Sequence, residues 1–455
     1  MKSTGVAVLA LGCVQAFQHP AALRLAPSQN VNLARMSSVN APAETEVATK
    51  KRLHVQLGEK VVDLTGWRAK HPAGPHWIDR FQNRDATDVF TAFHSDKAME
   101  MVQKMPAVKG STPAEVLSSQ PSEVTKNFRA FRAKLVEDGW FKRKPLNEAF
   151  NVLANLGTYA YGFTLIKTNP VLATLVLGVA HTTGGWVSHD SVHGRGPWCN
   201  FMRCYGALMC GLNTKWWSEK HNLHHACTNE IGIDEDIMVE PFIYLWTPNE
   251  ERDRPWRKFQ ALYWPIPFSF TFALWRFDSL KTVCVVSNYL KAKQLISADG
   301  KLRPSLMAHY IAMLAFVPLP IAIGHILVGG LLTATIVTVT HTAEEYLLEE
   351  SDSYVDTQFR TTRDAICRDP VSEYIWGGMQ YQLEHHLFPT MPRYRYPALV
   401  PLVKQFAKEN NLEYRETGQW KIIADNVKLL KNVASNPVEG SSPSPFVNPR
   451  PLASF

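Results

Sequence analysis

The chain has 455 residues, 45% of them hydrophobic, and a formal net charge of +7 at pH 7. That length exceeds a typical single domain, so we expect two or three domains. The lysines and arginines are scattered beside apolar runs and form no basic block, so the charge argues against a nucleic-acid partner and favours contact with a membrane surface. The seven cysteines have no CxxC or disulfide-framework spacing, and we expect free thiols.

Residues 1–50 have the composition of a targeting leader. One lysine precedes a short apolar run, Gly5–Val14, and small residues allow cleavage after Ala16, as in a secretory signal peptide. The next stretch is basic, and the first acidic residue of the chain is Glu44, as in an organelle transit peptide. The pair resembles the bipartite plastid-targeting leaders of algae with secondary plastids. A lipoprotein signal ending at Cys13 and a merely disordered N-terminus are the alternatives.

Residues 51–107 predict a small α+β domain, because short strand-like pieces at Leu53–Leu57 and Lys60–Leu64 precede helical pieces. The stretches HPAG and RDATDVFTAFH in this region resemble the haem-binding signature of the cytochrome b5 family. The resemblance implies that His71 and His94 are the axial ligands of a haem b, which requires both imidazoles to be neutral at the coordinating nitrogen.

This signature departs from the family at one position. The family usually has two glycines after the proline, and here Ala73 takes the first place. If that position requires a positive φ, alanine costs up to about 1 kcal/mol, so we expect a weaker turn but retention of haem. The domain is also less acidic than is usual in the family, which leaves its reductase-docking surface undefined.

Residues 108–140 predict a linker followed by an amphipathic helix, Val124–Trp140. Phe128, Phe131, Leu135 and Val136 share one side of this helix. The apolar side suits either a membrane surface or packing against the next domain, and the sequence does not decide between them.

Residues 141–431 contain two apolar blocks, each of which predicts a transmembrane helical hairpin. The first consists of Asn151–Ile166 and Val171–Val187, and the second of Leu306–Ile323 and His325–Val339, with two prolines marking a kink or the turn. Because a hairpin leaves and returns on one face, everything outside the tight turns lies on the same side. Lysines and arginines are abundant there, which follows the positive-inside pattern.

Histidine clusters flank the two predicted hairpins. HDSVH and HNLHH follow the first, and VTHTAEE and QLEHH follow the second, so the topology puts all of them on one membrane face. So many imidazoles exceed the four ligands that close a zinc site, and the haem domain supplies one-electron chemistry, so we predict two non-haem irons. Hydrogen-bonded core histidines are the alternative. The histidines are His189, His193, His221, His224, His225, His341, His385 and His386.

Acidic residues near these clusters are candidates to orient the imidazoles by accepting the N–H that does not face a metal. The candidates are Asp190, Asp234, Asp236, Glu344, Glu345 and Glu384.

HDSVH, HNLHH and QLEHH, together with two hairpins and an N-terminal b5-like domain, resemble the front-end fatty acyl desaturases. The resemblance implies a di-iron enzyme that uses O2, two electrons and two protons to insert a cis double bond between an existing double bond and the carboxyl end. It carries over seven of the histidines as ligands, and His341 matches an extra histidine of related desaturases. Gln382 occupies the place of a third histidine, which marks the front-end subgroup and makes it a candidate catalytic residue.

The expected architecture is therefore a b5-like α+β domain followed by an all-α multi-pass membrane desaturase domain with a histidine-rich helical cap. The tail, residues 432–455, is rich in proline and serine and predicted to be disordered. The resemblance further implies a Δ6 product, a fatty acyl lipid substrate, and a cytochrome b5 reductase or ferredoxin system as electron donor. We expect a plastid membrane, with the endoplasmic reticulum as the alternative. A lipid hydroxylase on the same irons and a non-catalytic electron-transfer membrane protein are the alternative functions.

Overall fold

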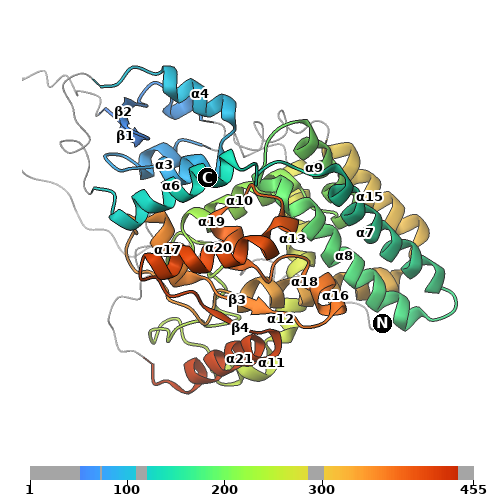
Figure 1. The fold of residues 1–455 in the computed structure, drawn as a ribbon. Helices are drawn as coiled ribbons and strands as arrows, with labels where there is room; N and C mark the ends of the chain where they lie inside the picture. The colour runs from blue at the N-terminus through green and yellow to red at the C-terminus, as the bar shows by residue number, and fades with distance from the viewer. Residues whose placement is uncertain (1–51, 72–73, 109–119, 285–301, 439–455) are drawn as a thin grey trace, which may run out of the picture. The chain divides into compact units, whose positions relative to one another are not determined.

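The computed structural model describes residues 52–71, 74–108, 120–284 and 302–438 (Figure 1). The predicted leader, most of the linker and the position of Ala73 lie outside the described residues. The disordered tail was predicted to begin at residue 432, but this boundary is wrong because helix α21 (Gln419–Ser435) continues to Ser435. Its last turns pack inward through Leu430 and Val433, and this burial holds the helix together.

The N-terminal part has the predicted α+β character. Strands β1 (His54–Leu57) and β2 (Lys60–Asp63) pair antiparallel with His54 opposite Asp63. The positive φ of Gly58 forms the turn between them. The short elements that follow are η1 (Arg68–Lys70), α2 (His76–Arg80), α3 (Thr87–Phe93) and α4 (Asp96–Lys104).

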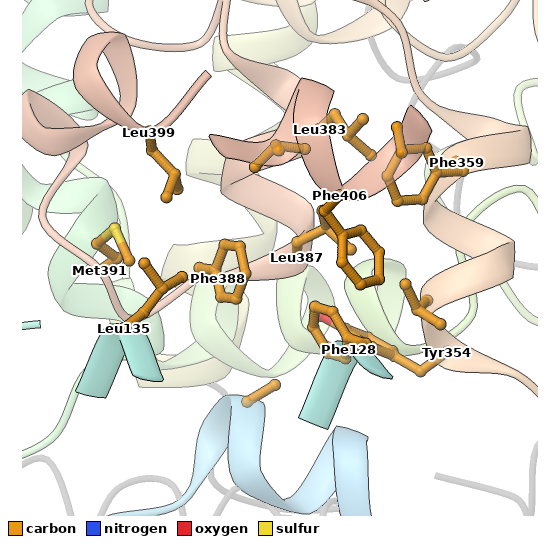
Figure 2. Close-up of a cluster of buried hydrophobic side chains, with 14 of the residues drawn as sticks. Phe128, Leu135, Tyr354, Phe359, Leu383, Leu387, Phe388, Met391, Leu399 and Phe406 are labelled. Carbon is orange, nitrogen blue, oxygen red and sulfur yellow. The ribbon is translucent and has the colours of Figure 1, made fainter. Parts of the chain in front are cut away.

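Helix α6 (Glu123–Glu137) is the predicted amphipathic helix, and it packs against protein. Ser122 caps its first turn by accepting a hydrogen bond from the backbone N–H of Thr125 at 3.1 Å. Phe128 and Leu135 are buried in an aromatic cluster that Figure 2 shows around Phe388. The packing interpretation of this helix is therefore confirmed, but its assignment of Val136 to the packed side is wrong, because Val136 is exposed.

We call this cluster the cap core. It joins side chains from distant parts of the chain, and pairs such as Phe131 and Phe406 stack at 5.3 Å between ring centroids. Its buried members are Ala92, Phe93, Phe128, Leu135, Tyr354, Val355, Phe359, Leu383, Leu387, Phe388, Met391, Tyr396, Leu399, Val403, Phe406 and Ala407.

The first apolar block forms α7 (Pro145–Leu165) and α8 (Pro170–His193), as predicted, except that α8 continues beyond Val187 to His193. The second block forms α15 (Leu302–Phe316) and α16 (Leu319–Val339). The predicted first arm of this block, Leu306–Ile323, is wrong, because the chain turns at Val317 and Pro318. Proline favours the first turn of a new helix over the interior of an existing one.

Two of the described helices, α8 and α16, are long and apolar enough to cross a membrane, and α15 is a shorter apolar helix. Helix α8 packs against α7, α16 and α9 (Pro197–Cys210), whereas α15 packs against α9. Small residues allow the close approaches. A Cβ on Gly178 of α8 would overlap Val328 of α16, and one on Gly330 would overlap the carbonyl oxygen of Ser269.

The remaining elements form the cap beside these helices. Helices α10 and α19 are far apart in sequence but lie side by side (Figure 1). Strands β3 (Asp364–Ile366) and β4 (Glu416–Gly418) pair in parallel. The helices are α10 (Thr214–Ala226), η2 (Pro255–Phe259), α11 (Gln260–Tyr263), α12 (Pro265–Ser269), α13 (Thr271–Cys284), α17 (Tyr354–Thr361), α18 (Pro370–Trp376), α19 (Gln382–Leu387), η3 (Arg393–Arg395) and α20 (Tyr396–Glu409).

Candidate metal centre and haem site

Three helix segments bring the histidine motifs together. The last turn of α8 carries HDSVH, α10 carries HNLHH, and the short α19 carries QLEHH. Asn213 starts α10 by accepting hydrogen bonds from the backbone N–H groups of Lys215 and Trp216. The last residues of α10 then present imidazoles on neighbouring turns toward α8 and α19.

One group of imidazoles joins all three helices. Candidate ligand atoms of His189, His193, His221 and His385 lie within 4.8 Å of one another. The Nε2 atom of His221 is 2.6 Å from Nε2 of His189 and 3.2 Å from Nε2 of His225. This group can hold one metal ion.

A second group lies beside the first. Candidate ligand atoms of His224, His341 and His386 lie within 4.8 Å of one another. The side-chain amide nitrogen of Gln382 is 2.8 Å from Nε2 of His341 and 3.2 Å from Nε2 of His386. This group can hold a second ion. The structure thus brings all eight histidines predicted for the iron pair, together with Gln382, into one buried cluster.

His225 links the two groups. Its ring stacks on His386 of the second group at 3.9 Å between centroids. It also lies 4.5 Å from His385 and 4.5 Å from His193, both in the first group. The two candidate metal positions are therefore adjacent, and the imidazole of His225 contacts the ligands of both.

Of the acidic candidates for orienting an imidazole, Asp234 makes the expected contact, with its Oδ2 atom 2.8 Å from Nδ1 of His224. Asp236 is 3.7 Å from the same nitrogen and pairs with Lys220. The prediction is wrong for the other four, which make no bond to an imidazole among the described residues and contact another donor through at least one oxygen each. Asp190 accepts from the backbone of Arg393, Glu344 pairs with Arg363 and Arg415, Glu345 pairs with Arg360, and Glu384 accepts from Tyr414.

Uncharged groups orient three other imidazoles, and sequence reasoning missed them. The Nδ1 atom of His193 is 2.7 Å from Asn222 Oδ1, that of His386 is 2.8 Å from Gln358 Oε1, and that of His341 is 2.9 Å from the carbonyl oxygen of Thr361. Such bonds fix the tautomer that leaves Nε2 available to a metal. Asn222 lies inside the HNLHH motif and could have been suspected, whereas Gln358 belongs to no motif.

The cluster passes a test of fit for cations. The buried atoms His193 Nε2, His385 Nε2 and Gln382 Oε1 have no hydrogen-bond partner within the part of the chain that the structure describes. The same holds for Nδ1 of His189 and His225. A buried polar atom without a partner costs about 1–3 kcal/mol, so a cluster of them is expected only where a bound group satisfies them.

Burial also sets the protonation state of the cluster. Burial lowers the pKa of His221, His225, His385 and His386 well below the ordinary value, and the pKa of His341 to about 3. These imidazoles are neutral at physiological pH, which is the state that binds a metal.

The predicted haem ligands face each other in the N-terminal part. The rings of His71 and His94 are 6.1 Å apart between centroids. An ion bound about 2 Å from one nitrogen of each imidazole gives a centroid separation of about 6 Å. Nδ1 of His71 is 3.0 Å from the carbonyl oxygen of Gly74, and Nδ1 of His94 is 3.0 Å from that of Phe90, which leaves both Nε2 atoms for haem iron.

Two known protein families match this chain. Residues 168–418 match the fatty acid desaturase family, and residues 41–110 match the cytochrome b5-like haem/steroid binding domain. The chain belongs to the fatty acid desaturase family. It joins a b5-like domain to that enzyme, so it is an oxidoreductase of the b5-fused, front-end desaturase class, and the resemblance seen in the sequence is confirmed.

Several curated relatives are similar over most of their length. An acyl-lipid 8-desaturase of Rebecca salina is 29% identical over 437 residues, covering 90% of this chain and 96% of the relative. An acyl-lipid (9-3)-desaturase of Physcomitrium patens is 29% identical, covering 85% and 76%. A Delta(6)-fatty-acid desaturase of Caenorhabditis elegans is 28% identical, covering 81% and 93%.

Proposed function

We propose that this protein inserts a cis double bond between an existing double bond and the carboxyl end of a polyunsaturated acyl chain, with Δ6 as the position. The observation that carries the proposal is the convergence of the imidazoles and Gln382 into two adjoining groups, each able to hold an ion. The b5-like domain on the same chain suits a reaction that consumes electrons singly.

We propose that one iron is held by His189, His193, His221 and His385, and the other by His224, His341 and His386, with His225 between them. Iron would supply the activation of O2, because acid–base side chains cannot break unactivated methylene C–H bonds. The residues of the chain hold the ions, keep His221, His225, His341, His385 and His386 neutral by burial, and orient imidazoles through Asp234, Asn222, Gln358 and the Thr361 carbonyl. Metal analysis of purified protein should give about two non-haem irons and one haem per chain. Haem without other iron would contradict the assignment.

The position of the new double bond is tested by its product. Relatives named as 8-, Delta(6)- and Delta(5)-desaturases resemble this chain to similar extents, so Δ6 rests on the sequence resemblance. The experiment expresses the protein in yeast fed with separate polyunsaturated fatty acids and locates new double bonds by mass spectrometry. A Δ5 or Δ8 product would correct the position, and a hydroxylated product would favour the hydroxylase alternative. Comparing the acyl-lipid and acyl-CoA pools over time identifies the substrate form.

We further propose a multi-pass membrane protein with a leader at 1–50, a haem domain at 51–107, a linker and helix at 108–140, and a desaturase domain that begins at 141 and includes α21 to Ser435. Large exposed apolar side chains on the bundle helices support their immersion in a membrane, including Leu146 and Phe150 on α7 and Leu314 on α15.

We propose a plastid membrane as the location, because of the composition of the leader. Residues 1–50 fused to a fluorescent protein should enter the plastid of an alga with secondary plastids. Retention in the endoplasmic reticulum would overturn this and would favour a b5 reductase over ferredoxin as donor.

A further inference from the structure

Phe93 lies between the haem ligand and the candidate metal centre. It is the last residue of α3 and directly precedes His94. Its ring is 6.1 Å from that of His193 and 6.3 Å from that of His225, measured between centroids. Only 6% of its surface is exposed. The residue bonded to the haem ligand His94 thus packs its side chain against the candidate metal centre.

The contact is held in place by charged and polar bonds from α6 to α3. Arg129 donates from Nε to Asp88 at 2.9 Å and from Nη2 to Asp85 at 2.7 Å. One turn later, Arg132 donates to the carbonyl oxygen of Thr91 at 2.8 Å. These bonds fix α3 just before the turn that carries Phe93. Because Asp88 is buried, losing its arginine partner would leave a costly unpaired carboxylate.

Apolar packing continues the contact into the cap. Phe93 belongs to the cap core together with Leu387 and Phe388, which directly follow His385 and His386. The covalent chain from His94 to Phe93, and then the packed rings of His193 and His225, form one contiguous path. Electron transfer through protein slows steeply as the gap between redox centres widens, and it is fastest through bonded and packed atoms.

We propose that Phe93 is a positioning residue that sets the rate of electron transfer from the haem to the iron pair, and that the haem domain stays docked through Arg129 while it delivers electrons. The inference rests on the proposed function. Each transfer oxidises ferrous haem to ferric haem and reduces one ferric ion of the pair to ferrous. An external flavin-type or iron–sulfur reductase then returns the haem to ferrous. Two such transfers and the two C–H electrons of the substrate reduce one O2 to two waters, with two protons from solvent.

The experiment follows the haem and requires no turnover. Full-length protein loaded with haem and ferric iron is held without O2, the haem is reduced by a flash with a photoactivated flavin, and the loss of ferrous-haem absorbance is recorded. We expect a first-order decay whose rate constant is independent of protein concentration. In Phe93→Leu the decay should be about ten- to hundredfold slower, since small displacements near reacting centres have effects of that size. Haem spectrum, haem potential and iron content should match the wild type.

Phe359→Leu is the matched control, because Phe359 is equally buried in the cap core but lies on α17. It should decay at the wild-type rate. Arg129→Gln removes the docking bonds to Asp85 and Asp88 but keeps phenylalanine at position 93. If Phe93→Leu loses haem, Arg129→Gln provides the test instead. It should also slow the decay. A wild-type rate in either Phe93→Leu or Arg129→Gln, or a wild-type decay that accelerates with protein concentration, would overturn the inference. Failure of the proposed function looks different: wild-type protein would hold haem but no other iron, and its ferrous haem would persist.

Discussion

Gln382 contacts the Nε2 atoms of His341 and His386, two of the three imidazoles in the second group, at the place where the sequence motif of other desaturases has a histidine. An amide presents either its nitrogen or its oxygen when the terminal torsion rotates by half a turn. Its Oε1 atom is buried without a hydrogen-bond partner among the described residues, so rotation toward a cation would satisfy it. A neutral oxygen donor binds iron less strongly than imidazole, which would leave this ion more open to O2.

Replacing Gln382 by alanine should remove this contact and lower product formation about ten- to a hundredfold, while the haem absorption spectrum is unchanged. Fatty acid analysis of expressing yeast measures the first quantity and spectroscopy the second. Gln380→Ala is the matched control, since Gln380 is equally buried but its amide bonds Glu373 and Gly378, away from the imidazoles. Full activity in Gln382→Ala would show that the residue is characteristic of the subgroup but has no part in catalysis.

Asp234 stabilises the donor nitrogen of His224 with a full negative charge. Burial lowers the pKa of His224, but the Asp234 and Asp236 carboxylates together outweigh burial and leave the pKa raised. Asp234→Asn should therefore weaken iron retention about ten- to a hundredfold, measured by competition with a chelator. Asp236→Asn should have a much smaller effect, because its oxygen is 3.7 Å from the same nitrogen. Equal losses in the two variants would contradict this role.

Among the elements, the helices that present the site follow from local rules. The apolar runs predicted α7 and α8, although α7 begins earlier, at Pro145, and α8 ends later, at His193. The two prolines marked the turn between α15 and α16 as one of two alternatives, but the first arm was extended to Ile323 because the apolar run continues through the turn. The periodicity of apolar residues predicted the apolar face of α6 but not what it packs against, because such a face can contact either lipid or protein. Gln358 was missed because its contact with His386 joins different elements.

Close helix packing gives a prediction at this scale. Gly330→Ala should destabilise the protein by about 1–3 kcal/mol, because the added methyl would overlap the backbone of Ser269 on α12. Thermal unfolding in detergent, followed by circular dichroism, measures the fall in Tm. On α7, Gly157 has open space around it, so Gly157→Ala should leave Tm unchanged or raise it. An unchanged Tm in Gly330→Ala would show that α12 and α16 can separate without cost.

For the whole molecule, the sequence predicted the haem and desaturase parts but not their contact. Arg129 binds Asp85 and Asp88 across more than 40 residues, and no local pattern marks such a pair. The cap core takes Ala92 and Phe93 from the haem-binding part, Phe128 and Leu135 from α6, and the rest from the desaturase part. A shared core unfolds cooperatively, since separating the parts would expose apolar surface on both.

Haem release and loss of structure in the cap should therefore occur together on heating. Haem absorbance and hydrogen exchange of α19 and α20 should change at the same temperature. Helix α15, which packs on α9, serves as the internal reference for the bundle. Haem release well below the temperature at which α19 and α20 lose protection would contradict a common unfolding unit.

The cap core also bears on how such fusions diversify. Exchanging the haem part between two relatives at a linker boundary would transplant the counterparts of Ala92 and Phe93 into a pocket shaped by another α6 and α19. Because packing in a buried core is sensitive to single methyl groups, most chimaeras would have a poorly packed cap core even if the haem site and the metal centre were intact. Exchanges that transfer the α6 segment together with the haem part should be compatible. The unit that can be exchanged therefore includes α6 as well as the haem-binding motif.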